Sequence, residues 1–132
     1  MELARTASSF PFDRVANGSV VTIGAFDGLH LGHRALLDAA NDAASSLGVP
    51  VIVMSFEPTP REYFSVGTPP ARLMRFREKF EALADSDIDV FFCPRFNKAM
   101  REISASTFIR QLLIHTFNTK TLVIGDDFCF AR

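Results

Sequence analysis

Residues 24–33 read GAFDGLHLGH and lie between two segments with different hydrophobic patterns. Residues 19–25 are almost continuously apolar and rich in β-branched side chains, which predicts a buried strand. Residues 31–47 carry leucine and alanine at helical spacing, and Gly48 follows directly, which predicts a helix that ends at a C′ glycine. The stretch therefore predicts a strand, a glycine loop and a helix in immediate succession.

Three glycines and two histidines make this loop suited to a phosphate group. Gly24, Gly28 and Gly32 let the backbone turn tightly and approach a ligand closely. The N-terminus of the following helix would offer free N–H groups and a partial positive charge. His30 and His33 are three residues apart, which places both on one helix face if the helix has begun by residue 29. Two imidazoles at such a helix end could clamp one phosphoryl group.

Simpler interpretations of the same residues remain open at this point. A glycine loop before a helix is often only a tight connection, and a histidine pair could bind a metal. The chain has neither the HExxH pattern nor a third ligand at zinc spacing, so we predict no protein metal site. Residues 24–33 also match neither GxGxxG nor GxxxxGK[ST], which excludes a dinucleotide fingerprint and a P-loop at this position.

Composition limits the class of protein. The chain has 132 residues, 48% of them hydrophobic, which suits one domain with a core of normal size. Lysine and arginine number 14 against 15 acidic residues, so the formal charge of -1 gives no reason to expect nucleic acid or a membrane surface as a partner. Cys93 and Cys129 form no CxxC pair, and the longest apolar run, 51–54, is far too short to span a membrane. We therefore expect a reduced, cytoplasmic protein.

The rest of the chain predicts alternating strands and helices. Residues 1–17 form a lead-in whose composition disfavours a regular element, although a short strand is possible there. The remaining expected elements are strands at 49–56, 88–93 and 121–125, and helices that begin at 68 and 104. The short return from the first helix predicts parallel strands with a right-handed crossover. The pattern is typical of an α/β fold, a Rossmann-like open and mostly parallel sheet with helices on both faces.

Two helices of this pattern have assignable faces. The helix that begins at 68 should turn an apolar stripe inward, made of Leu73, Phe76, Phe80 and Leu83. Its basic residues are expected on a solvated face: Arg72, Arg75, Arg77 and Lys79. In the last helix, Ser104 is the expected N-cap, and the inward side chains are Phe108, Leu112 and Leu113.

Three loops should meet at one edge of this sheet. Residues 57–64 (EPTPREYF), 95–98 and 126–130 each follow a predicted strand. Because parallel strands share a carboxyl edge, we expect these loops to converge with the glycine loop. Ligands of open α/β sheets collect at that edge.

Three segments carry a family resemblance. GAFDGLHLGH, with its HxGH at 30–33, resembles the signature of the FAD synthetase (FMN adenylyltransferase) module of bacterial bifunctional riboflavin kinase/FAD synthetases, within the HxGH nucleotidylyltransferase superfamily. Residues 56–64 resemble that family's F-x-P-x-P-R-x-x-F segment, with Thr59 where histidine is common. Residues 125–131 resemble G-x-D/N-F-x-F-G, with Cys129 in place of a basic residue and Ala131 in place of glycine. The resemblance covers residues 19–132 and implies the nucleotidylyltransferase type of the α/β fold.

The resemblance implies a nucleotidyltransferase that moves AMP from ATP to FMN and yields FAD and pyrophosphate, with Mg²⁺ accompanying the nucleotide. His30 and His33 would be the catalytic residues. The nucleotide would be bound by Gly24, Ala25, Phe26, Asp27, Gly32 and Asp127. The flavin-binding side of the site would be lined by Pro58, Phe64 and Phe128.

The resemblance also implies segments beyond residue 132. The family module normally adds a strand and an I-S-S-T-x-I-R segment that holds the ATP phosphates, followed by a riboflavin kinase domain. Residues 104–110 (SASTFIR) look similar, but they precede the 125–131 segment instead of following it, so we do not assign them this role. We therefore expect residues 1–132 to be an FAD synthetase domain that is incomplete at its C-terminus, lacks the kinase domain, exposes residues 122–124 as an apolar edge and has impaired activity.

Two alternatives remain open, and the second of them belongs to a different class. The chain could be another HxGH nucleotidylyltransferase, with pantetheine phosphate, nicotinamide mononucleotide or glycerol phosphate as the acceptor. It could also be a remnant that binds a nucleotide or a flavin without catalysis.

Overall fold

The computed structural model describes residues 1–24, 31–55, 76–94, 107 and 110–124. Within these described ranges, five parallel strands form one sheet in the order β1-β4-β3-β2-β5. The strands are β1 (Glu2–Ala4), β2 (Ser19–Ile23), β3 (Val51–Met54), β4 (Val90–Phe92) and β5 (Thr119–Val123). The helices are α1 (Leu31–Leu47) and α3 (Phe76–Ala84), two 3-10 turns η1 (Ala7–Ser9) and η2 (Phe12–Val15), and a π-helical turn η3 (Leu112–Thr116).

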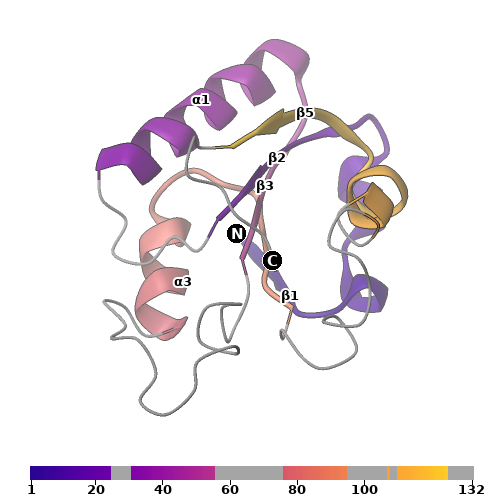
Figure 1. The fold of residues 1–132 in the computed structure, drawn as a ribbon, viewed down its shortest axis with the longest axis horizontal. Coiled ribbons are helices and arrows are strands. Elements are labelled where there is room, and N and C mark those ends of the chain that lie inside the picture. Colours follow the sequence, from indigo (N-terminus) through magenta and orange to yellow (C-terminus); the bar gives the residue numbers. More distant parts are fainter. Residues whose placement is uncertain (25–30, 56–75, 95–106, 108–109, 125–132) are drawn as a thin grey trace.

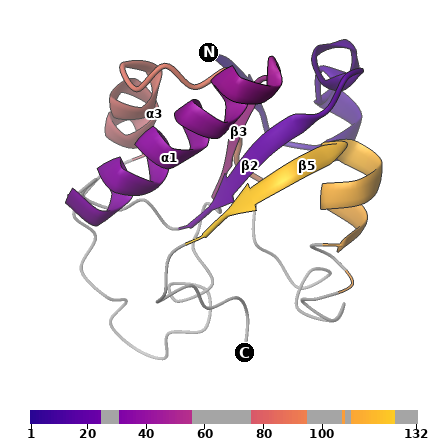
Figure 2. The same cartoon turned by 90° about the horizontal axis from the view of Figure 1, so that it is seen from above.

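Helical segments cover both faces of the sheet, as predicted. Helices α1 and α3 lie on one face, and η1, η2 and η3 lie on the other (Figures 1 and 2). Successive strand residues alternate between two cores, because side chains of a strand point to opposite faces. The core under α1 and α3 contains Val20, Leu37, Ala40, Ala44, Val51, Val53, Leu83 and Phe91. The core on the other face contains Phe10, Val15, Val21, Ile23, Ile52, Met54, Phe92, Leu112 and Phe117.

Helix α1 has the bounds that its sequence pattern predicts. It runs from Leu31 to Leu47, and Gly48 follows with a φ of 70°. The N–H groups of Gly48 and Val49 both donate to the carbonyl of Ala44, at 2.8 and 3.1 Å. A left-handed residue at this place suits glycine, because it has no Cβ to clash with the backbone.

The strands are shorter than predicted or shifted along the chain. β3 begins at Val51 because Val49 completes the end of α1 and Pro50 has no N–H to donate. β4 occupies 90–92 instead of 88–93, after Asp87, which has a left-handed φ of 58°. β5 begins two residues earlier than expected, at Thr119, directly after left-handed Asn118 (φ 49°).

Helix α3 confirms the inward positions of Phe76, Phe80 and Leu83 but corrects the assignment of Lys79. Lys79 is only 2% exposed, whereas Arg77 is exposed as predicted. The prediction for Lys79 was wrong because helical phase outweighs charge at this position. Lys79 lies three residues after Phe76 and four before Leu83, so it shares their face. Leu73, Arg72 and Arg75 lie outside the described residues.

The N-terminal lead-in forms a fifth strand and a part of the core. β1 pairs with β4 in parallel and occupies one edge of the described sheet. Phe10 is 4% exposed, and its ring contacts Phe92 and Phe117, with centroids 6.0 and 5.1 Å away. A short strand here was only one possibility, because three residues carry too little pattern to distinguish a strand from a loop.

The last predicted helix is described only toward its end. Leu112 is buried and Leu113 packs against the same core, which confirms their inward positions. The segment finishes as the π-helical turn η3, in which the N–H of Phe117 donates to the carbonyl of Leu112 at 2.8 Å. Ser104 and Phe108 lie outside the described residues.

Candidate functional site

The carboxyl ends of the strands form one continuous edge. Backbone hydrogen bonds extend the sheet by one residue past three strands, from Gly24 to Met54 (3.1 Å), from Ser55 to Phe92 (3.0 Å) and from Cys93 to Ala4 (2.9 Å). The parallel prediction for the strands is therefore confirmed. The loops at 57–64, 95–98 and 126–130 lie outside the described residues, so their convergence stays a prediction.

The strand order reverses at β2. The chain passes from β2 through α1 to β3 and on to β4 on one side, and it returns to β5 on the other side of β2 (Figure 1). Open α/β sheets bind ligands in the crevice at such a reversal, outside the carboxyl ends of the strands. Gly24 follows β2 at this point, so the start of the GAFDGLHLGH stretch is at the expected place for a ligand.

The first turn of α1 brings His33 to the sheet side of the helix. His33 precedes Leu37, Ala40 and Ala44 by four, seven and eleven residues, and these three side chains are buried under the helix. His33 is half-buried, and its Nδ1 atom is shielded from solvent. The first N–H groups of any α-helix lack partners within the helix, so this end can accept an anion beside the imidazole.

The structure describes three of the predicted site residues. Gly24 follows β2, and Gly32 and His33 lie in the first turn of α1. The i, i+3 relation of His30 to His33 therefore stays a prediction, because His30 is not described. The other predicted residues outside the described part are Ala25, Phe26, Asp27, Pro58, Phe64, Asp127 and Phe128.

The same edge carries polar residues that sequence reasoning missed. Ser55 and Cys93 follow β3 and β4 and are fully buried. Arg5 follows β1, and its guanidinium carbon lies 4.7 Å from the centroid of the Phe76 ring. No motif marks these residues, and only the parallel register places them on the same edge of the sheet as Gly24.

Within the described ranges, no group of three His, Cys, Asp or Glu side chains is arranged to hold a metal ion. The helices of these ranges also include none that is long and apolar enough to cross a membrane.

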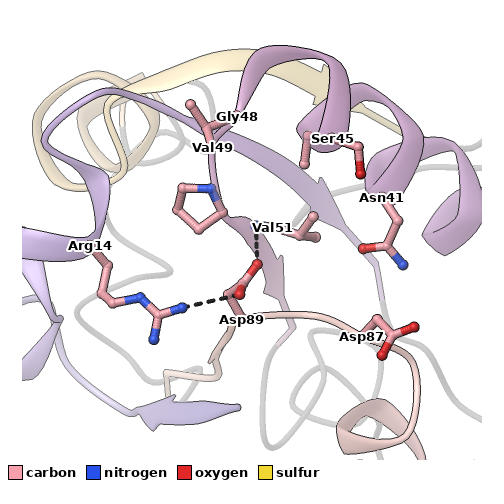
Figure 3. Close-up of a pocket in the computed structure, with 10 residues that line it drawn as sticks. Arg14, Asn41, Ser45, Gly48, Val49, Val51, Asp87 and Asp89 are labelled. Atoms are coloured by element: carbon pink, nitrogen blue, oxygen red, sulfur yellow. Dashed lines mark hydrogen bonds and ion pairs between the residues drawn. The ribbon is translucent and has the colours of Figure 1, made fainter.

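A pocket of about 500 Å³ lies at the opposite edge of the sheet, at the amino ends of β3 and β4 (Figure 3). Asp89 organises its floor: the carboxylate accepts the N–H of Val51 at 2.8 Å and pairs with Arg14 at 3.1 Å. Arg14 also pairs with Glu2 at 2.6 Å. These contacts join β1, β3 and β4 at their amino ends. The pocket is therefore remote from Gly24 and His33, and we assign it a structural role.

The strand–loop–helix segment lies within a match to a known family of proteins. The family model for FAD synthetase matches residues 13–132. The bifunctional riboflavin kinase/FMN adenylyltransferase of Escherichia coli (strain K12) is 45% identical over 114 residues, which are 86% of this chain and 36% of that protein. The protein of the same name from Haemophilus influenzae is 43% identical over 119 residues, 90% of this chain and 39% of that protein.

A solved structure shares the fold. The crystal structure of a macrolide-efflux protein from Streptococcus pneumoniae superposes with a TM-score of 0.81 at 25% identity, over 97% of this chain and 41% of that chain. The chain described here spans little more than a third of the length of the E. coli relative. The match over residues 13–132, together with the identity to these relatives, shows that the chain belongs to the FAD synthetase family.

Proposed function

We propose that this chain is the part of a nucleotidyltransferase that moves AMP from ATP to the phosphate of FMN, giving FAD and pyrophosphate. The observation that carries the proposal is the 45% identity to a protein named as an FMN adenylyltransferase. The aligned family region contains a glycine loop and helix N-terminus at the reversal of strand order, where a nucleotide phosphate would bind.

The proposed chemistry requires little beyond positioning and neutralisation of charge. The FMN phosphate is already an anion, so no general base is needed for its attack on the α-phosphate of ATP. His33, His30 and the N-terminus of α1 would stabilise the charge that develops on the α-phosphate. The proposed nucleotide contacts are Gly24, Ala25, Phe26, Asp27, Gly32 and Asp127. The proposed flavin contacts are Pro58, Phe64 and Phe128.

Mg²⁺, a kinase domain and a cytoplasmic location complete the proposal. Mg²⁺ would enter with the triphosphate, whose oxygens are among its preferred ligands. The relatives are named for a riboflavin kinase activity as well, so a kinase domain is the partner we expect in the full-length protein. We expect neither nucleic acid nor a membrane among the partners.

The decisive experiment supplies the purified chain with ATP, Mg²⁺ and FMN and follows FAD by chromatography. Parallel reactions replace FMN with pantetheine phosphate, nicotinamide mononucleotide or glycerol phosphate. We expect product with FMN and with none of the other acceptors. We also expect His33→Ala to lower the rate by roughly 10²–10³. His115→Ala is the matched control, because His115 is an exposed histidine of η3.

Each alternative function has its own outcome. Product from another acceptor would show that the chain catalyses a different nucleotidylyltransferase reaction. Binding of FMN or ATP without turnover, by the purified chain and by the full-length protein alike, would identify a binding protein and contradict the catalytic proposal.

A further inference from the structure

Arg5 occupies the far end of the ligand edge. It follows Ala4, the last residue of β1, whose carbonyl accepts the N–H of Cys93 at 2.9 Å. This bond extends the same ladder that joins Gly24 and Ser55 to their neighbouring strands. Arg5 is therefore at the carboxyl edge of the sheet, on the strand farthest from β5.

An aromatic pair holds the guanidinium of Arg5. Its central carbon lies 4.7 Å from the centroid of the Phe76 ring, the distance of a cation–π contact. The Phe76 ring stacks on Phe91, with centroids 6.0 Å apart and 19° between the planes. Phe91 is fully buried in β4, so the ring under Arg5 is anchored in the core.

The guanidinium N–H groups of Arg5 have no acceptor in the described part of the chain. Arg14 pairs with Glu2 and Asp89, and Arg77 pairs with Glu81 at 3.3 Å. Arg5 makes no such pair among the described residues, although it is half-buried. A guanidinium that stacks on a ring keeps its donors at its rim, where they match a planar or anionic acceptor.

The distance of Arg5 from the end of β2 indicates which part of a substrate could reach it. β1 lies three strand spacings from β2, about 14 Å along the edge of the sheet. In the proposed reaction the phosphate of FMN reacts near the end of β2. An FMN extended along the edge across β3 and β4 would carry its ring toward β1. The pyrimidine part of that ring has two carbonyl oxygens, which are suitable acceptors for a guanidinium.

We propose that Arg5 is a substrate-binding residue that recognises the dioxopyrimidine edge of the flavin ring. Phe76 fixes the plane of the guanidinium, and the N–H groups of Arg5 donate to one ring carbonyl and to the acceptor nitrogen beside it. This assignment rests on the proposed function, because it takes FMN as the acceptor of AMP. It also explains how the edge of the sheet would reject acceptors that carry a phosphate but lack such a ring.

The test measures ligand affinity with the 132-residue chain. Wild type and Arg5→Met are titrated with FMN, with riboflavin, which has the ring without the phosphate, and with pyrophosphate, which has phosphate without the ring. We expect Arg5→Met to lower the affinity for FMN and for riboflavin by about tenfold, which is the effect of losing a hydrogen bond from a charged donor. The affinity for pyrophosphate should not change. Arg5→Lys should not restore the affinity, because lysine keeps the charge but loses the planar fork.

Arg77→Met is the matched control, because it removes an arginine of α3 whose side chain is 90% exposed. Circular dichroism confirms that each variant is folded, and Arg5→Gln replaces Arg5→Met if the latter is not. Equal flavin affinity in wild type and the folded Arg5 variant would overturn the inference alone. Loss of pyrophosphate affinity with riboflavin affinity unchanged, or full rescue by lysine, would show a general anion contact instead and would overturn the inference. Absence of flavin binding by wild type would overturn the proposed acceptor, and with it this assignment.

Discussion

At the scale of single residues, two buried hydroxyl groups of β2 differ in their partners. Ser19 donates to the carbonyl of Phe117 at 2.6 Å in the interior. Thr22 is fully buried, and its Oγ1 has no hydrogen-bond partner among the described residues. A buried polar atom without a hydrogen-bond partner lowers the free energy of unfolding, whereas a buried atom with a partner raises it modestly.

Thr22→Val should therefore raise the free energy of unfolding by about 1 kcal/mol, because valine removes the hydroxyl and keeps the branched shape. Ser19→Ala should lower it by about 1–2 kcal/mol, because it leaves the Phe117 carbonyl unsatisfied. Chemical denaturation of both variants beside wild type measures these changes. A destabilised Thr22→Val would show that the hydroxyl has an acceptor in solution.

Gly18 is a backbone position that only glycine occupies without strain. Its φ is 109°, and a Cβ placed there would lie 2.5 Å from the Cγ of Lys120. Gly18→Ala should cost about 1–3 kcal/mol of unfolding free energy, more than Gly48→Ala, whose Cβ would meet open space. The double variant Gly18→Ala/Lys120→Ala should recover only the part of this cost that comes from the clash with the Lys120 side chain, and the part that comes from the positive φ should remain. Equal costs at Gly18 and Gly48 would contradict this account.

At the scale of elements, β5 exposes apolar side chains at the edge of the described sheet. Leu122 of β5 is 41% exposed, Ile124 directly after β5 is 43% exposed, and Ile114 of η3 is 60% exposed. β5 pairs with β2 on one side. An apolar edge strand of this kind is a template for pairing with another chain.

We expect the purified chain to self-associate in a concentration-dependent way, and Leu122→Lys to shift it toward monomer. Analytical ultracentrifugation measures the change. Leu47→Lys is the matched control, because Leu47 is 52% exposed at the end of α1. Similar association of wild type and Leu122→Lys would show that β5 is not the contact.

At the scale of the whole molecule, the two edges of the sheet differ in role. The carboxyl edge carries Gly24, His33 and Arg5, which belong to the proposed site. At the amino edge, the contacts of Asp89 with Val51 and Arg14 join neighbouring elements of the sheet. Function and stability are therefore assigned to opposite ends of the same strands.

The segment before the family match is part of the core of the whole fold. The match begins at residue 13, yet Phe10 is buried against Phe92 and Phe117. Phe10→Ala should lower the free energy of unfolding by about 3–5 kcal/mol, the usual cost of deleting a buried phenyl ring. Phe12→Ala, at a ring that is 51% exposed, should cost far less. Thermal unfolding of the pair measures the difference, and similar midpoints would contradict the assignment of Phe10 to the core.

Local patterns in the sequence were enough to predict the elements around the site. The bounds of α1 and the glycine at its end follow from helical spacing and a single C′ residue, both of which are read within one segment. The parallel sheet followed from the alternation of strands and helices. The resemblance of residues 24–33 indicated the family, and the match over 13–132 confirms it.

Tertiary structure alone decided the rest. The place of β1 beside β4 depends on pairing between residues almost ninety positions apart, as in Glu2 with Val90, and a three-residue strand has no period of its own. Lys79 is buried because helical phase directs it inward whatever its charge. Arg5 meets Phe76 only because β1 and α3 are brought together at one corner of the sheet. Hydrophobic periodicity is a property of a short segment, whereas pairing and contact belong to the folded chain, so the sequence determined the elements and tertiary packing determined which of them meet.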